Sequence, residues 1–197
     1  MRHTISVLVE NEFGVLSRVS GLFSGRGFNI ESLSVAPTLD PTISRMTIVT
    51  SGDDRILEQI NKQLNKLIDT IKIIDFTGED FIEREMALIK VTADENSRAE
   101  ILRIADIFRG KIVDVTPKCY TVEVTGSPVK VNAIIDLLRP MGIKELVRSG
   151  PVVLGRGPKG WKSGLVRLPE RRDNGAPAIK MLARTFHYGT IVSYLNQ

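Results

Sequence analysis

The chain has little of several residue types, and each shortage excludes a class of protein. Its 197 residues include a single cysteine, Cys119, which rules out an internal disulfide framework and suits a reducing compartment. No uninterrupted apolar run approaches the roughly 20 residues that span a bilayer, and the first residues carry no signal-peptide pattern. The sequence therefore predicts a soluble, cytoplasmic protein with no membrane partner.

Residues that carry catalysis or bind metals are also scarce. The two histidines, His3 and His187, lie at opposite ends of the chain and have no carboxylate or cysteine at ligand spacing, so we expect no metal site. Gly155–Ser163 resembles a phosphate-binding P-loop, but Trp161 separates its glycine from the lysine, and the motif requires them contiguous. We find no nucleophile elbow and no carboxylate pair singled out by spacing. The sequence therefore predicts no catalytic residue and no activity for the chain alone.

The positive net charge comes from one end of the chain. From Arg156 onward there are eight Lys/Arg against two Asp/Glu, so residues 1–155 hold 19 basic and 21 acidic groups. A slightly acidic body gives no support for nucleic-acid binding. Residues 158–197 form a basic tail rich in Gly and Pro, which we expect to be largely disordered.

Helical and strand periodicities alternate twice along the remaining residues. Strands are predicted over 5–9, 28–35, 43–50 and 71–76, with a helix that Gly14 opens and a helix with an apolar stripe from Ile56 to Ile68. Either Asp53 or Asp54 can cap the second of these helices. The order βαββαβ within about 75 residues is ferredoxin-like.

The same order then repeats. Strands are predicted over 86–92, 112–115, 120–125 and 143–147, and helices over 97–108 and 127–138. Ser97 with Glu100 is typical of a capping box, and Ser127 with Pro128 of a helix start. We expect an α+β protein of two tandem ferredoxin-like domains, 1–78 and 79–157. Each sheet would carry helices on one face only, so the bare faces and edges favour a dimer.

The stretch from Asn11 to Asn29 has the strongest functional pattern. A strand delivers the chain to a polar turn, and Gly14 opens a helix whose first N–H groups could hold a carboxylate or phosphate. Asn29 could reach an amino group with its side-chain carbonyl. Two structural alternatives stay open: Gly14 eases a tight turn and nothing more, and Asn29 makes a local turn bond.

Several segments carry a resemblance to a known family. They are Ile5–Val19, Leu22–Val35, Ser44–Ile48, Leu57–Leu64, Glu83–Val91 and Ile107–Val115. Together they are similar to the acetolactate (acetohydroxyacid) synthase small subunit with its N-terminal ACT domain. The resemblance covers residues 2–157 in order and without large gaps.

The resemblance implies a homodimer that binds the catalytic large subunit, raises its activity and confers feedback inhibition by valine in branched-chain amino acid synthesis. It implies that valine lies between two ACT domains, with its carboxylate on backbone groups of Asn11, Gly14, Val15 and Leu16 and its amine on Asn29 of the other protomer. Ile30 and Leu16 would wall the side-chain pocket, and Ala36 matches a position where bulk disturbs feedback.

The resemblance also implies that thiamine diphosphate, Mg²⁺ and FAD belong to the catalytic partner. Consistent with this, the chain lacks the Gly-Asp-Gly…Asn-Asn pattern of thiamine-diphosphate enzymes. The alternative is a free-standing ACT-type amino-acid sensor that controls another enzyme or a transcription complex. Residues 158–197 have no counterpart in the family. They are a genuine extension or the product of a shifted or vector-derived reading frame, and their charge and low periodicity favour the second.

Overall fold

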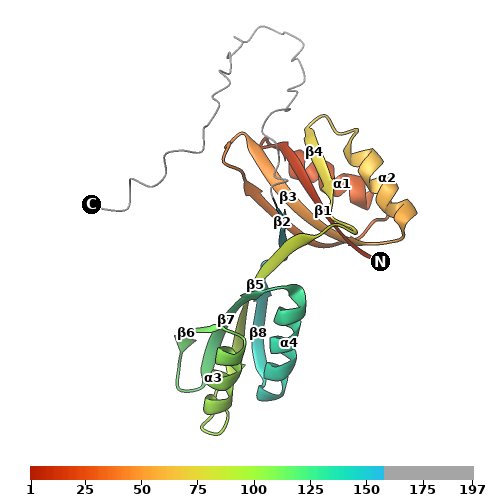
Figure 1. Ribbon diagram of the computed structural model, residues 1–197. Coiled ribbons are helices and arrows are strands. Elements are labelled where there is room, and N and C mark those ends of the chain that lie inside the picture. Colours follow the sequence, from red (N-terminus) through yellow and green to blue (C-terminus); the bar gives the residue numbers. More distant parts are fainter. Residues whose placement is uncertain (158–197) are drawn as a thin grey trace. The chain divides into compact units, whose positions relative to one another are not determined.

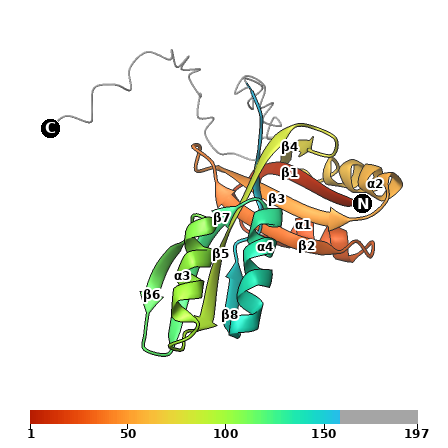
Figure 2. The ribbon, with the colours of Figure 1, turned by 60° about the horizontal axis from the view of Figure 1, so that its bottom comes forward.

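The computed structural model describes residues 1–157, which form two four-stranded antiparallel sheets, each with two helices, and one further strand (Figures 1 and 2). The first sheet has the strand order β2-β3-β1-β4. Its elements are β1 (Arg2–Glu10), α1 (Val15–Ser24), β2 (Ile30–Pro37), β3 (Ile43–Ser51), α2 (Asp54–Leu64) and β4 (Thr70–Asp75). The predicted βαββαβ order is confirmed.

The second half repeats this arrangement with the order β6-β7-β5-β8. Its elements are β5 (Phe81–Thr92), α3 (Arg98–Ile107), β6 (Lys111–Val115), β7 (Cys119–Gly126), α4 (Pro128–Leu138), a 3₁₀ turn (Arg139–Met141) and β8 (Ile143–Arg148). A further strand, β9 (Val152–Gly155), pairs with the first residues of β5. β9 was not predicted from the sequence. The predicted tail, 158–197, lies outside the described residues, and the division at residue 78 stays a prediction.

Two of the three predicted helix N-terminal caps are confirmed. Asp53 caps α2, with its Oδ1 accepting a hydrogen bond from Ile56 N at 2.8 Å. Ser127 caps α4, and Pro128 occupies the first turn. Both caps satisfy backbone N–H groups that have no partner within the helix.

The predicted capping box at Ser97 and Glu100 is wrong. Glu100 pairs with Arg103 instead, and Ser97 Oγ accepts from Asp94 N while Asp94 Oδ1 accepts from Ser97 N. The reciprocal hydrogen bonds of a capping box therefore form between Asp94 and Ser97, three residues closer to the N-terminus than predicted. Hydrogen bonding of its carboxylate to the side chain and the backbone of Ser97 lowers the pKa of Asp94.

The predicted stripe of the second helix is too long. α2 ends at Leu64, and Ile68 lies beyond it with most of its side chain exposed. Leu67 still packs against the core from the turn that follows the helix. The helical spacing of apolar residues in the sequence therefore extends past Leu64, where the helix itself ends.

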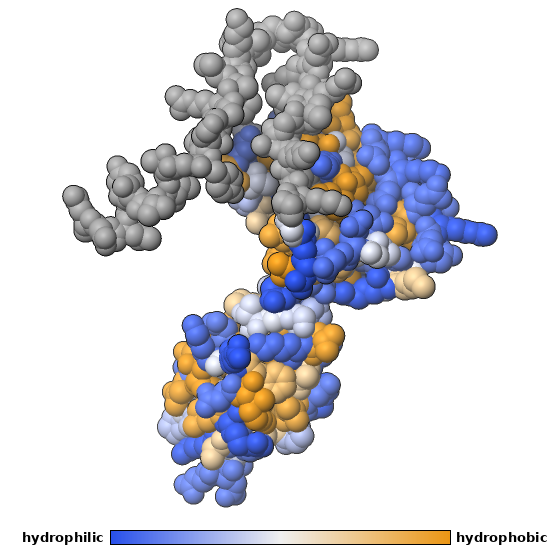
Figure 3. Space-filling view, viewed as in Figure 1, coloured by the Kyte–Doolittle hydropathy of each residue, from blue (hydrophilic) through white to orange (hydrophobic). Residues whose placement is uncertain are grey.

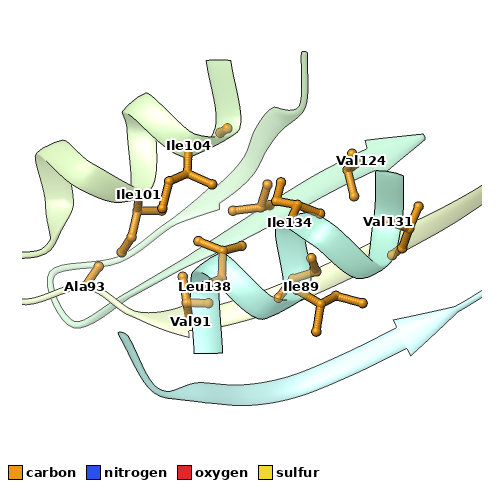
Figure 4. Packing of buried hydrophobic residues seen from close by; sticks show 13 residues of the cluster. Ile89, Val91, Ala93, Ile101, Ile104, Val124, Val131, Ile134 and Leu138 are labelled. Atoms are coloured by element: carbon orange, nitrogen blue, oxygen red, sulfur yellow. The ribbon is translucent and has the colours of Figure 1, made fainter. Parts of the chain in front are cut away.

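Each sheet packs its helices on one face, as predicted. In the second domain Ile89 and Val91 of β5 face Ile101 and Ile104 of α3 and Ile134 of α4 (Figure 4). Successive strand residues alternate between faces, so the residues between these core positions point away from the helices. The buried residues of this core are isoleucine, valine, leucine and alanine.

The opposite face of the first sheet is less bare than predicted. Ile5, Val7 and Val9 pack under the helices, yet Ser6 and Thr47, which point the other way, are also buried. Arg45 lies on that face, where its Nε donates to Ser6 Oγ at 2.8 Å and its Nη2 to Val153 O at 2.7 Å. Burial lowers the pKa of Arg45.

Candidate functional site

The turn after β1 is held by the β2–β3 hairpin. Asn11 N donates to Thr42 O at 2.7 Å, and Asn11 Nδ2 donates to Pro41 O at 2.8 Å. The backbone N–H of Asn11 and one of its two Nδ2–H groups are therefore bonded to the hairpin. Asn11 holds the turn in place, and its second Nδ2–H and its side-chain oxygen are left for a ligand.

Gly14 begins α1 in a conformation that favours glycine. Its φ is +83°, in the left-handed region where a Cβ is strained. The backbone N–H groups of Gly14, Leu16 and Ser17 have no acceptor among residues 1–157, and Val15 N reaches Glu12 O only at 3.4 Å. No side chain caps this helix. The positive end of the helix dipole therefore meets solvent with its donors free for an anion.

The side chains predicted near the turn divide into two groups. Val15 is 3% exposed and belongs to the hydrophobic core, so only its backbone can meet a ligand. Leu16 is 46% exposed and can line an apolar pocket. Ile30 is partly buried and packs against the core from the start of β2.

Asn29 lies far from this turn within one chain. Strand pairing puts Ile30 opposite Thr50, and Pro37 opposite Ser44. The turn follows Glu10, which pairs with Ile43 at the Pro37 end. Thr50 follows Ser44 by six residue steps along β3, so the two halves of the predicted site are about 20 Å apart. One protomer does not bring Asn29 and Gly14 together.

The side-chain amide of Asn29 is available for a ligand. Asn29 is exposed, and its backbone O accepts from Thr50 Oγ1 at 2.6 Å. Among residues 1–157 its amide makes no hydrogen bond, so the local turn bond considered from the sequence does not form.

Ala36 lies near the turn end of β2, paired with Arg45 of β3. It lines a cavity of about 290 Å³ together with Thr47 and Val153. This cavity is on the face of the sheet opposite the helices, because the neighbouring Val35 pairs with the core residue Met46.

Sequence reasoning missed two charged residues beside the turn. Arg18 of α1 and Asp69 of the α2–β4 turn form an ion pair, with Nε and Oδ2 2.6 Å apart. Arg18 follows Gly14 by one helical turn, which a search of the sequence could have noticed. Asp69 carries no local signal because only the fold brings it to this place.

Other candidate groups have structural partners. His3 is buried, with its ring nitrogens hydrogen-bonded to Thr77 Oγ1 and Gly52 O. Cys119 Sγ lies 3.1 Å from Thr116 Oγ1. Within residues 1–157 no group of three or more His, Cys, Asp or Glu side chains could hold a metal ion. None of the helices described there is long and apolar enough to cross a membrane.

Comparison with family models matches both halves of the chain. Residues 5–72 match the ACT domain of the acetohydroxyacid synthase small subunit type, and residues 84–157 match the small subunit of acetolactate synthase. The Gly14 turn and Asn29 lie in the first match.

Individual relatives agree over nearly their whole lengths. The acetolactate synthase small subunit of Haemophilus influenzae is 57% identical over 160 residues, which are 81% of this chain and 98% of that protein. The probable small subunit of Archaeoglobus fulgidus is 56% identical over 159 residues, 81% of this chain and 99% of that one. The crystal structure of the Thermotoga maritima small subunit superposes with a TM-score of 0.73 at 42% identity and covers 80% of this chain and 98% of its own. The chain therefore belongs to the acetolactate synthase small-subunit family.

Proposed function

We propose that this chain is the non-catalytic regulatory subunit of acetolactate synthase. It raises the activity of the thiamine-diphosphate-dependent large subunit and confers feedback inhibition by valine in the synthesis of valine, isoleucine and leucine. Membership in the family over both domains supports this assignment. Thiamine diphosphate, Mg²⁺ and FAD belong to the large subunit in this proposal.

The observation that carries the valine site is the set of free N–H groups at Gly14 and Leu16. They start a helix with no side-chain cap, which is the arrangement that binds a carboxylate. A free amino acid also carries an ammonium group, for which the amide oxygen of Asn29 is a suitable acceptor. The site therefore needs both groups within the length of one small ligand.

A homodimer brings these groups together. β2 is an edge strand of the first sheet, so its outward backbone groups can pair with another strand. If two copies of β2 pair antiparallel about a two-fold axis, Ile30 of one chain approaches the Pro37 end of the other. Asn29 of one protomer then lies beside the Gly14 turn of its partner, and each dimer holds two equivalent sites.

The same pairing accounts for the apolar half of the ligand. Leu16 is exposed beside the turn, and Ile30 would arrive next to Asn29 from the other protomer. These two side chains would enclose a branched aliphatic group. Ala36 is near the site at the dimer edge, where a larger side chain would disturb the pairing of the two strands.

The second domain is a candidate for contact with the large subunit. Several of its apolar side chains are exposed on helices and strands, and Figure 3 shows hydrophobic residues interspersed with hydrophilic ones over this part of the surface. They include Leu102, Ile107, Val113, Val115, Val129, Leu137 and Val147. A contact with the large subunit would cover these side chains.

Reconstitution with the purified large subunit tests the proposed function. The chain alone should form no acetolactate, and titrating it into the large subunit should raise turnover and make it sensitive to valine. An unchanged rate and an unchanged valine response would reject the proposal. Recovery of a nucleic-acid complex in place of the synthase would favour the free-standing sensor instead.

A further inference from the structure

One buried carboxylate is connected to both ends of the Gly14 turn. Asp69, in the turn between α2 and β4, is 6% exposed. Its backbone O accepts from Glu10 N at 2.9 Å, and its Oδ2 accepts from Arg18 Nε at 2.6 Å. Glu10 precedes the Gly14 turn and Arg18 follows it, so Asp69 is hydrogen-bonded to the chain on both sides of the turn.

The strand pairing around Asp69 is irregular at the same place. β1 pairs with β4 in one register up to Leu8 and Lys72, and the register shifts before Val9 and Thr70. The extra residue is Ile71 of β4, and a bulge bends the strand that carries it. The bulge therefore changes the direction of β4 next to Asp69, whose backbone O still accepts from Glu10 N.

The side chain of Arg18 returns toward the start of its own helix, as helical side chains do. A Cβ built on Gly14 would lie 3.1 Å from Arg18 Nη1, so the guanidinium packs directly against this glycine. Hydrogen bonding to Asp69 raises the pKa of Arg18, and the charge of Glu12 acts in the same direction. The guanidinium is therefore fixed between the buried carboxylate and the turn.

We propose that Arg18 and Asp69 are positioning residues of the effector site, which together hold the Gly14 turn so that its N–H groups point at the ligand carboxylate. Asp69 fixes Arg18, Arg18 supports Gly14, and the backbone bond to Glu10 fixes the opposite end. The inference rests on the proposed function, because it assumes that the ligand is an amino acid bound at this turn.

A rival explanation gives the two residues opposite effects. If Arg18 acted only as a positive charge for the ligand, Asp69 would weaken binding by neutralising it. Removing the charge of Asp69 would then strengthen valine binding, whereas positioning requires that it weaken binding. The sign of the change at Asp69 distinguishes the two.

Calorimetry of valine binding to the full chain tests the inference. Arg18→Met and Asp69→Asn should each weaken binding by about 3- to 30-fold, the range in which supporting residues change ligand affinity. The double variant should bind about as weakly as the weaker single variant, because the two residues act as one unit. Arg18→Lys keeps the charge but not the directed Nε bond and should fall between wild type and Arg18→Met.

Two controls separate positioning from loss of stability or charge. Glu58→Gln removes a charge from an exposed pair with Lys62, and Asp53→Ala removes the cap of α2 in the same domain. Neither should change valine affinity. Arg18 is 46% exposed, so Arg18→Met should fold even if Asp69→Asn does not.

Each outcome then has one meaning. Normal valine affinity in Arg18→Met, or tighter binding in Asp69→Asn, would overturn the inference while valine binding by the wild-type chain upholds the site. Absence of valine binding by the wild-type chain would instead reject the proposed function, on which the inference depends.

Discussion

At the scale of single residues, Gly14 is the position where a substitution acts most directly on the proposed site. Its φ of +83° disfavours any side chain, at a cost of roughly 1–2 kcal/mol. A Cβ there would also press on Arg18 Nη1. An aspartate adds a negative charge beside the expected carboxylate, a repulsion of about 1–4 kcal/mol at partial burial. We predict that Gly14→Asp abolishes the valine response and that Gly14→Ala weakens it.

Gly78 offers a matched control for this prediction. It also has a positive φ, +77°, but a Cβ there would meet nothing within 4 Å, and it lies between β4 and β5, outside the residues assigned to the site. Gly78→Ala should therefore introduce a similar backbone strain to Gly14→Ala and leave valine affinity unchanged. Calorimetry with thermal denaturation measures both quantities, and wild-type affinity in Gly14→Asp would disprove the assignment.

At the scale of elements, the start of α2 tests the choice between two adjacent aspartates. Asp53 accepts a hydrogen bond from Ile56 N, whereas Asp54 is the first residue of the helix and caps nothing. We predict that Asp53→Ala lowers the free energy of unfolding by about 1 kcal/mol. Asp54→Ala should lower it by less, because it removes only an interaction with the helix dipole. Denaturant unfolding of both variants makes the comparison, and equal losses would contradict the assigned cap.

The elements that sequence reasoning predicted are those with local signals. Alternating apolar residues located β1 and β3, and Ser127 with Pro128 located the start of α4, since each pattern depends on neighbours in the chain. β9 was missed because its four residues are a strand only through pairing with Phe81–Arg84. The capping box failed because Asp94, three residues earlier, offers the better acceptor for Ser97 N.

In the candidate site, too, the residues that could be predicted are those with a local sequence pattern. Gly14 stands out because a glycine between a strand and a helix is a local pattern. Asn29 came with it, but the sequence could not place it 20 Å away at the other end of β2. The role of Asp69 could not be predicted from the sequence, because Asp69 lies in a turn that follows a different helix and only the fold brings it to Arg18.

At the scale of the whole molecule, the separation of Gly14 from Asn29 makes the proposed dimer testable by complementation. Asn29→Ala should weaken valine binding by roughly 1–3 kcal/mol, the value of a hydrogen bond to a charged group. A homodimer of Gly14→Asp and a homodimer of Asn29→Ala each have two defective sites. In a mixed dimer, one site receives both defects and the other receives neither.

We therefore predict that mixing the two variants under conditions that exchange subunits restores valine binding at one site per heterodimer. The two chains can carry different affinity tags so that the heterodimer is purified, and calorimetry then gives the number of sites and their affinity. A matched control mixes Gly14→Asp with the double variant Gly14→Asp/Asn29→Ala, which leaves no dimer with an intact site. Restoration in the first mixture requires that the turn and Asn29 come from different protomers, because a site built within one chain would stay defective in every combination. No restoration in a verified heterodimer would reject the shared site even if the family assignment stands.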